Sequence, residues 1–309
     1  MQRSGTLTYV ALMTAVVLWG LSFVWSKVVL EEFDVFILVF LRFSLAALIF
    51  VGVLFATGRG LPKLTLAEHG RMMLLALFQP FAYFMCETMG LTLTSASSAS
   101  LIVTTIPIMV LVMSAVLLKE RITGIKTLSV LLSAAGVVML VMGAADFSWS
   151  LEGGLLGDLL MLGAVVAAAC YMVLARYLGR KHDALDITFL QMAYGSVLFL
   201  PFFLWKLPEF EPSAISNQAW VGFAFLTVLC SFGAFACYNY TLTKIEASRA
   251  SVFINGVPVV TVVAAWIALG ERLTLVQGLG GAVVITAVLL PNMAMLPTLR
   301  RLRRAGAKA

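Results

Sequence analysis

Apolar residues run along this chain in blocks of about 20 residues, which charged residues or Gly and Pro separate. A block of that length is what an α-helix needs to cross the hydrocarbon core of a bilayer, and the shorter periods of a soluble core are absent. The pattern therefore predicts an all-α integral membrane protein with ten transmembrane helices. They are expected at 6–29, 34–56, 70–93, 96–118, 124–143, 154–177, 186–206, 217–243, 247–269 and 274–296.

The composition agrees with a membrane location. Hydrophobic residues make up 61% of the 309 positions and charged residues only 12%, whereas soluble domains carry roughly 25% charged residues. Arg3 precedes the first block, as a basic residue precedes the apolar region of a signal peptide. The block is too long for such a region, however, and lacks a small-x-small cleavage site. We therefore interpret it as the first span.

Basic residues mark one side of the membrane. With the N-terminus in the cytoplasm, 17 of the 21 Lys and Arg residues fall on the cytoplasmic side, and the RRLRR sequence at 300–304 contributes four of them. The opposite loops are neutral or acidic, as in EEFD at 31–34. The positive-inside rule predicts a multi-pass protein of the inner (plasma) membrane with both termini cytoplasmic. Tail charge also accounts for the net charge of +6 without a nucleic-acid partner.

The chain contains an internal repeat. Residues 94–123 and 245–274, which lie 151 positions apart, are identical at ten of 30 positions. The matches include Ala96/Ala247, Ser97/Ser248, Ala99/Ala250, Ser100/Ser251, Pro107/Pro258, Glu120/Glu271 and Arg121/Arg272. The predicted repeats are 1–146 and 147–297, followed by a basic tail at 298–309. Because five helices is an odd number, the second repeat is expected to enter the membrane inverted, which suits a carrier that exposes one midplane site to each side in turn.

The doubled A-S-x-A-S…P…ER block, with WGLSF at 19–23 and the five-plus-five layout, resembles EamA-type members of the drug/metabolite transporter superfamily. The resemblance covers essentially the whole chain. It implies a ten-helix carrier whose central cavity is lined mainly by the first, third, fourth, sixth, eighth and ninth helices. Members of this family export amino acids, other metabolites or drugs, and some take solutes up.

Glu87 lies inside the apolar third block, and its nearest basic residues in the sequence are Arg71 and Lys119. An acid deep in the bilayer costs about 2.5–3.5 kcal/mol on insertion scales, and ionisable groups there are usually functional. Loss of water favours the neutral form of a carboxyl group. We hypothesise that Glu87 binds a proton or a substrate ammonium during transport. The alternative is that it only fastens helices together.

Polar and aromatic side chains recur at helical spacing in several blocks. Gln79, Tyr83 and Glu87 lie at i, i+4 and i+8, and Pro80 is expected to free backbone groups that only protein or water can satisfy. The stripes together predict a polar, aromatic-lined cavity. Its expected residues are Trp19, Ser22, Gln79, Tyr83, Glu87, Ser100, Thr104, Tyr171, Tyr238, Asn239, Ser251 and Asn255. For the serine and threonine stripes, hydrogen bonding between packed helices is the stronger interpretation.

Other charged residues near the blocks have structural interpretations. Arg42 is expected to snorkel outward or to pair with Asp34 or Glu32, and Lys27 to pair with the same acidic loop. The acid of each of the pairs Glu120–Arg121 and Glu271–Arg272 is expected to cap the first turn of the helix that follows. A role for these pairs as gate latches stays open.

The remaining motifs add little chemistry. Pro107 and Pro258 occupy matching positions and predict kinks. The four cysteines show no paired spacing and the two histidines lie in charged loops, so we expect no disulfide, metal or other cofactor.

The sequence offers little support for a membrane enzyme or a channel. A membrane enzyme needs a convergent catalytic set, and a channel needs charged rings or a filter motif, and neither pattern stands out. The sequence favours a secondary transporter that exports amino acids or related metabolites by alternating access, with protons as a further partner. A facilitator and a drug or amine exporter of the same fold are alternatives. Substrate identity, flux direction, coupling ion and oligomeric state stay open.

Overall fold

The computed structural model describes residues 2–93, 102–143, 155–269 and 274–293, and these residues form helices and their connections without any strand. The helices of the first half are α1 (Gln2–Leu30), α2 (Val35–Ala56), α3 (Leu66–Ala76), η1 (Leu77–Ala82), α4 (Tyr83–Leu93), α6 (Ile106–Leu118) and α7 (Gly124–Met142). Those of the second half are α8 (Leu155–Leu178), α9 (Ala184–Lys206), η2 (Leu207–Glu209), η3 (Pro212–Ala214), α10 (Asn217–Ala224), η4 (Phe225–Ala234), α11 (Phe235–Lys244), α12 (Ala247–Ile254), α13 (Val257–Leu269) and α14 (Leu275–Met293).

The helices occur where the apolar blocks predict them. Within the described residues, eight helical stretches are long and apolar enough to cross a membrane, and they match eight of the predicted spans. The fourth and tenth predicted spans contain shorter apolar helices, Ile106–Leu118 and Leu275–Leu290. The prediction of a multi-pass helical membrane fold is therefore confirmed, while the number of ten spans stays a prediction.

Polar side chains define where several helices begin. Asp34 accepts hydrogen bonds from the N–H groups of Phe36 and Ile37 at the start of α2. Thr65 and Glu68 form a capping box at the start of α3. Ser216 accepts the N–H of Ala219 at the start of α10. These side chains satisfy backbone donors that have no partner inside the helix.

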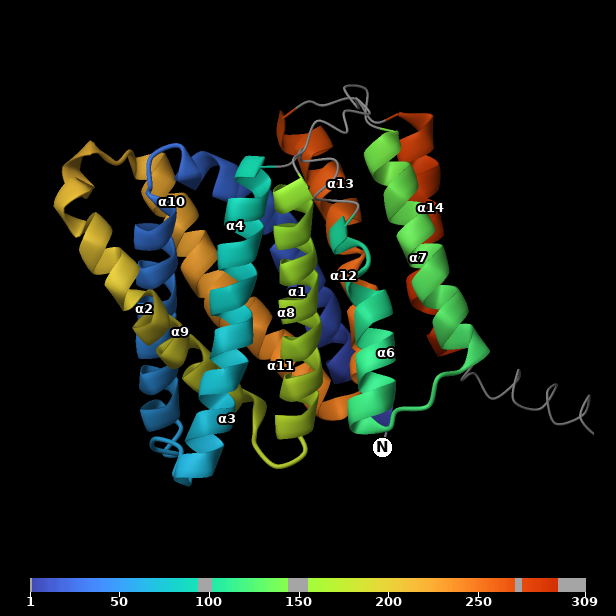
Figure 1. Ribbon diagram of the computed structural model, residues 1–309, viewed down its shortest axis with the longest axis horizontal. Helices are drawn as coiled ribbons and strands as arrows, with labels where there is room; N and C mark the ends of the chain where they lie inside the picture. The colour runs from blue at the N-terminus through green and yellow to red at the C-terminus, as the bar shows by residue number, and fades with distance from the viewer. Residues whose placement is uncertain (1, 94–101, 144–154, 270–273, 294–309) are drawn as a thin grey trace, which may run out of the picture.

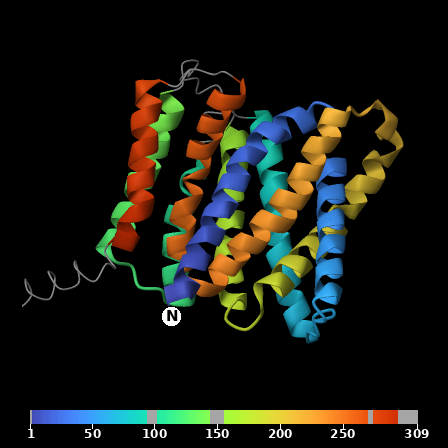
Figure 2. The same ribbon diagram turned by 180° about the vertical axis from the view of Figure 1, so that it is seen from behind.

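Helices from the two halves of the chain pack against each other. α2 lies beside α9 at one edge of the bundle, and α7 lies beside α14 at the opposite edge (Figure 1). Between the edges, α4 and α6 pack on α8, and α6 also packs on α12. Seen from behind, α1 runs diagonally beside the continuous helix formed by α10, η4 and α11 (Figure 2). Each of these contacts joins a helix of the first half to a helix of the second half.

The ends of the helices alternate between two faces of the bundle. The N-terminal end and the connections at 57–65, 119–123 and 179–183 lie at one end, and the connections at 31–34 and 207–216 lie at the other (Figure 1). This alternation is the one that successive membrane crossings require.

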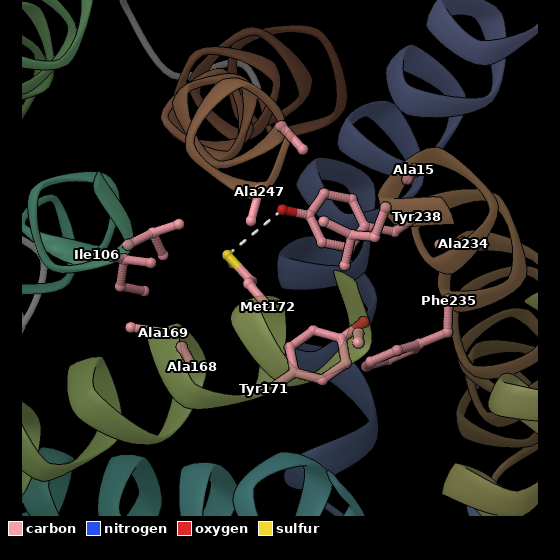
Figure 3. Packing of buried hydrophobic residues seen from close by; sticks show 14 of the residues in the cluster. Ala15, Ile106, Ala168, Ala169, Tyr171, Met172, Ala234, Phe235, Tyr238 and Ala247 are labelled. Atoms are coloured by element: carbon pink, nitrogen blue, oxygen red, sulfur yellow. Dashed lines mark hydrogen bonds between the residues drawn. The ribbon is translucent and has the colours of Figure 1, made fainter. Parts of the chain in front are cut away.

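The centre of the bundle contains large aromatic residues surrounded by small ones. Tyr171 and Tyr238 are almost fully buried, and the Tyr238 hydroxyl lies 3.4 Å from the sulfur of Met172 (Figure 3). Small side chains from several helices border them and allow the helix backbones to approach closely. Those labelled in Figure 3 are Ala15, Ala168, Ala169, Ala234 and Ala247.

Glycine brings α7 and α14 into direct backbone contact. A Cβ atom added to Gly136 would lie 2.9 Å from the carbonyl oxygen of Gly280, and one added to Gly280 would lie 2.8 Å from that of Gly136. Both distances are shorter than any ordinary van der Waals contact. The edge formed by α7 and α14 therefore depends on the absence of side chains at these two positions.

Candidate functional site

The helix that carries Glu87 is interrupted before it reaches that residue. Between α3 and α4 the segment η1 contains a break in the helix, because Gln79 inside it has extended dihedral angles of φ −147° and ψ 119°. The Gln79 carbonyl accepts a hydrogen bond of 3.0 Å from Nε2 of Gln191 in α9. The prediction that Pro80 frees a backbone group that protein must satisfy is confirmed. The prediction of a continuous helical face through Gln79, Tyr83 and Glu87 is wrong, because the extended backbone of Gln79 interrupts the helix there.

Beyond η1 the predicted face is present. Tyr83 and Glu87 lie one turn apart in α4, and the Tyr83 hydroxyl donates a hydrogen bond of 2.8 Å to the Glu87 carboxylate. Glu87 is partly buried, and no Lys or Arg of the described residues forms an ion pair with it. The acid is thus held by a neutral hydroxyl, which leaves its charge without a compensating cation within the described part of the chain.

A second group of predicted residues forms a buried hydrogen-bond network. The Tyr171 hydroxyl in α8 donates to Oδ1 of Asn239 in α11 over 2.9 Å. Nδ2 of Asn239 donates to Oε1 of Gln191 over 2.8 Å and to the Thr188 hydroxyl over 3.0 Å. Through its own Nε2 bond, Gln191 extends this network to the Gln79 carbonyl. The network therefore joins α8, α9, α11 and η1.

Gln191 and Thr188 are site residues that the sequence analysis missed. Both are buried polar side chains inside an otherwise apolar stretch of α9. An amide in lipid is expensive unless it is hydrogen-bonded, so the isolated Gln in this block was the available signal.

Aromatic residues cover the network on the side of α1. The Trp19 ring lies 5.1 Å from the Tyr238 ring and 5.2 Å from the Phe235 ring, measured between ring centres. Tyr171 and Phe235 point toward each other in the same region (Figure 3). The structure thus brings Trp19, Tyr171, Tyr238 and Asn239 together, as a cavity lined by these residues would require.

Four other predicted residues lie elsewhere in the packing. Nδ2 of Asn255 donates to the Ser133 hydroxyl of α7 over 3.0 Å. The Ser22 and Ser251 hydroxyls donate to backbone carbonyls of their own helices, those of Trp19 and Ser248 respectively. Thr104 is buried directly before α6. Of these bonds, only the Asn255–Ser133 bond joins two helices, so the interpretation of the serine stripes as bonds between packed helices is wrong for Ser22 and Ser251.

Pro107 and Pro258 lie where one helix ends and another begins, and not at kinks within a continuous helix. Pro107 lies in the first turn of α6, which begins at Ile106 after a turn. In the second half, α12 ends at Ile254 and α13 begins at Val257, so that Pro258 again lies in a first turn. Ser100, Glu271, Arg272 and the side chain of Lys27 lie outside the described residues.

Among the hollows that the described residues form are two that include no predicted cavity residue. One is an open groove of about 680 Å³ along α1, and its lining is almost wholly apolar. The other is a small cavity of about 20 Å³ between α2, α4 and α9. The groove is lined by Thr6, Tyr9, Val10, Met13, Thr14, Val17 and Leu18.

Arg42 does not snorkel, which corrects the prediction for this residue. It is 7% exposed, and its Nε and Nη2 atoms lie 3.3 and 3.2 Å from the hydroxyl of Ser231 in η4. Its two expected partners are engaged elsewhere, because Asp34 caps α2 and Glu32 binds Ser216. The packing of α2 against η4 turns the Arg42 side chain inward instead.

Glu120 also differs from its prediction, because it caps a helix of the other half rather than the helix that follows it. Its carboxylate accepts the N–H groups of Ala247 and Ser248 at 2.9 and 3.2 Å and the Ser248 hydroxyl at 2.6 Å. Next to this cap, Nζ of Lys126 lies 2.9 Å from the Glu246 carboxylate. The contact of α6 with α12 places the acid at the start of α12 rather than at the start of α7.

Comparison with known proteins agrees with this arrangement. The model of the EamA-like transporter family matches the chain twice, at residues 6–142 and 155–293. "Uncharacterized transporter YetK" of Bacillus subtilis is 26% identical over 280 residues, with 91% of this chain and 85% of that protein covered. An "Uncharacterized transporter" of Archaeoglobus fulgidus is 30% identical over 285 residues, with 92% and 96% covered.

A crystal structure of another protein shares the fold. It superimposes with a TM-score of 0.79 at 19% identity and covers 96% of this chain and 98% of that one. The two family matches together span most of the chain, including α3–η1–α4 with Glu87 and α10–η4–α11 with Asn239. The chain is therefore a multi-pass membrane protein that belongs to the EamA-like transporter family.

Proposed function

We propose that the protein is a secondary transporter that exports amino acids or related small metabolites by alternating access and is coupled to protons through Glu87. The observation that carries the proposal is the Tyr83–Glu87 hydrogen bond of 2.8 Å inside an apolar helix. Such an acid is retained in a membrane helix at an energetic cost, and proton relays are a common reason for it.

The position of Glu87 supports a role that changes during transport. It lies in α4, directly after the interrupted segment η1, so the direction of α4 depends on a turn that is not locked by the ordinary α-helical hydrogen bonds. A break inside a membrane helix is tolerated only where protein or water satisfies the freed backbone groups, and such breaks often line binding sites in transporters. Protonation of Glu87 removes its charge, and the energetic balance between conformations that expose or bury this carboxyl group then changes.

The network around Asn239 supports the proposal that the substrate is a small solute with both polar and apolar parts. Asn239 and Tyr171 offer amide and hydroxyl groups, and the rings of Trp19 and Tyr238 offer apolar faces beside them. Small-molecule sites usually combine a few fixed polar groups with an apolar or aromatic lining. The substrate is proposed to break some of the bonds within this network and to replace them with its own.

The proposal includes the placement of the chain in the membrane. Loops rich in Lys and Arg at 57–65, 119–123 and 179–183 share one end of the bundle with the N-terminal end. We assign this end to the cytoplasm of the inner (plasma) membrane, following the positive-inside rule. The two family matches are then inverted repeats of five helices each, between which the central site is exposed alternately to the two sides.

The test uses purified protein in liposomes that enclose a pH-sensitive dye. Twenty amino acids and a set of organic amines are added outside one at a time, and the internal pH is followed. Glu87→Gln is measured in parallel, and Glu211→Gln, which changes an exposed loop acid in the same way, is the control. We expect a solute-dependent pH change in the parent protein and in Glu211→Gln that is absent in Glu87→Gln.

Two other outcomes decide against the proposal. Solute flux without proton movement, equal in the parent and in Glu87→Gln, would make the protein a facilitator and Glu87 a structural acid. Flux of amines alone, with no response to any amino acid, would assign it to amine or drug export.

A further inference from the structure

The third and eighth predicted spans each contain a segment that departs from α-helical geometry, and the two segments lie at equivalent positions. Segment η1 covers 77–82 in one half, and a shift of 151 residues places it at 228–233, which lies inside η4 (225–234). The residues that cap the two helices, Thr65 and Ser216, are also 151 positions apart. Both halves therefore have a segment without regular α-helical geometry in the helix that leads to a site residue, a break at Gln79 in η1 and a π-helical run in η4.

A polar side chain from the opposite half of the chain binds each of these segments. Gln191 of the second half donates to the Gln79 carbonyl in η1 over 3.0 Å. Arg42 of the first half donates to the Ser231 hydroxyl in η4 from two of its nitrogens, over 3.3 and 3.2 Å. In both cases a polar side chain of one half binds the irregular segment of the other, at a backbone carbonyl in η1 and at a side-chain hydroxyl in η4.

Arg42 and Gln191 occupy equivalent positions in their own helices. Each follows the residue at the N-terminal boundary of its helix, Asp34 or Asp183, by the same number of positions. Each is preceded by the pair Phe-Leu, at 40–41 and at 189–190. The two side chains are therefore counterparts, although one is a cation and the other a neutral amide.

Both contacts are made by buried side chains, which have little access to water as an alternative partner. Gln191 is fully buried and Arg42 is 7% exposed. Among the described residues, no carboxylate forms an ion pair with Arg42, so its bonds to Ser231 are the polar contacts that hold it. At the break in η1, Gln191 supplies a partner for the Gln79 carbonyl, which ordinary helical bonding does not satisfy there. Arg42 instead holds η4 through the side chain of Ser231.

Each contact lies shortly before a residue of the candidate site. Glu87 follows Gln79 by about two helix turns, and Tyr238 follows Ser231 by about the same distance. Gln191 has a second role, because its Oε1 accepts the bond from Asn239, whose Oδ1 accepts the bond from Tyr171. One side chain therefore touches both the Tyr171–Asn239 network and the turn that leads to Tyr83 and Glu87.

We propose that Arg42 and Gln191 are a matched pair of positioning residues, each of which holds the irregular segment, η4 or η1, in the opposite half of the chain. Gln191 in addition transmits a change at Asn239 to η1 and so to Glu87. The inference rests on the proposed function only in taking Asn239 and Glu87 as parts of one transport site.

Two native cysteines report on the two segments. Cys86 in α4 and Cys237 in α11 lie at equivalent positions, 151 residues apart, and both thiols are free and partly buried. Two reporter proteins each keep one of these cysteines, with the other native cysteines changed to serine or alanine. The full-length protein is reconstituted in lipid nanodiscs, and the rate of labelling by N-ethylmaleimide is measured.

The variant Gln191→Leu tests the contact with η1. It is expected to raise the labelling rate of Cys86 about fivefold, the change in a local opening equilibrium that follows from losing one hydrogen bond. Ser196→Ala on the same helix, whose hydroxyl bonds only the Ala193 carbonyl, is the control and is expected to leave the rate unchanged. An unchanged rate in Gln191→Leu would overturn the proposal.

The variant Asn239→Leu tests transmission through Gln191. It is expected to raise the Cys86 rate, although Asn239 has no hydrogen bond to η1 or α4, and to have no further effect when combined with Gln191→Leu. Effects that simply add in the double variant would show that Gln191 does not connect the two sites.

The variant Ser231→Ala tests the matching contact without removing the buried guanidinium. It is expected to raise the labelling rate of Cys237 about fivefold and to leave Cys86 unchanged. Equal increases at both cysteines would indicate general loosening and would contradict the proposal. Because labelling requires no solute flux, these results are independent of whether Glu87→Gln abolishes proton coupling.

Discussion

The hydroxyl of Tyr83 lies 2.8 Å from the carboxylate of Glu87, one helical turn further along α4. A hydrogen bond to a charged group contributes about 1.5–3 kcal/mol when it is formed in one state and lost in another. The strength of this bond therefore matters for any cycle in which Glu87 gains and loses a proton.

Tyr83→Phe keeps the aromatic ring and removes this bond. We expect it to slow solute-driven proton movement into dye-loaded liposomes at least about tenfold. The double variant with Glu87→Gln should be no slower than Glu87→Gln alone, because the hydroxyl acts through the acid. Tyr177→Phe, at an exposed tyrosine of α8, is the control. Transport at the parent rate in Tyr83→Phe would show that the Tyr83 hydroxyl is not needed for proton coupling.

Ser248→Ala removes one of the three hydrogen bonds that Glu120 accepts at the start of α12. We expect the free energy of unfolding to fall by about 1–2 kcal/mol, as for the loss of a helix cap. Thermal unfolding in detergent measures the effect. Ser251→Ala, whose hydroxyl bonds only the Ser248 carbonyl of its own helix, should cost less. Equal losses for the two serines would argue against the cap between the halves.

Gly280→Ala places a methyl group between α7 and α14, 2.8 Å from the Gly136 carbonyl and 2.8 Å from the Leu140 nitrogen. Backbone atoms cannot move aside as a side chain can, so we expect a loss of about 1–3 kcal/mol in stability. Gly278→Ala on the same helix meets no atom within 4 Å. It should leave the unfolding temperature unchanged or raise it, because Ala favours a helix more than Gly does. A comparable loss at Gly278 would show that the close approach of α7 and α14 does not set the cost.

Glu32 gives a prediction about pH. The N–H of Ser216 and then its hydroxyl, at 2.6 and 2.7 Å, lower the pKa of Glu32 from its usual value of 4.5. Because the folded-state pKa is the lower one, the stabilisation is present above pH 4.5 and is lost as the pH falls through the folded-state value. The difference in unfolding temperature between the parent and Glu32→Gln should therefore shrink on acidification. Glu31→Gln removes the neighbouring carboxylate, and the same pH dependence there would contradict a specific role for Glu32.

Much of the fold could be predicted from the sequence because membrane helices are defined by long apolar blocks. Where a block begins with Asp34, the side chain caps the helix, and where it contains Pro80 or Pro258, the helix breaks nearby. These features depend on residues close together in the chain. The pairing of Tyr83 with Glu87 was predictable for the same reason, since it follows from the spacing within one helix.

Contacts between helices could not be predicted in this way. Arg42 bonds Ser231 and Glu120 bonds Ser248 because α2 packs on η4 and α6 packs on α12. Sequence spacing does not record which helices are neighbours. Both residues were therefore assigned to partners nearby in the chain, and both assignments were wrong. Gln191 was missed for a related reason, because its partners, the Gln79 carbonyl and Asn239, belong to other helices.

The cap on α12 has a consequence for biogenesis. Glu120 precedes Ala247 by 127 residues, so the acid is synthesised and inserted long before the helix end that it closes. Until α12 is synthesised, this carboxylate lacks the N–H groups that it accepts in the folded bundle. Membrane insertion can thus proceed span by span, but the first half reaches its final hydrogen-bonded form only after most of the second half has been translated. A chain truncated before Ala247 would present to the quality-control machinery a bundle that is inserted yet unfinished.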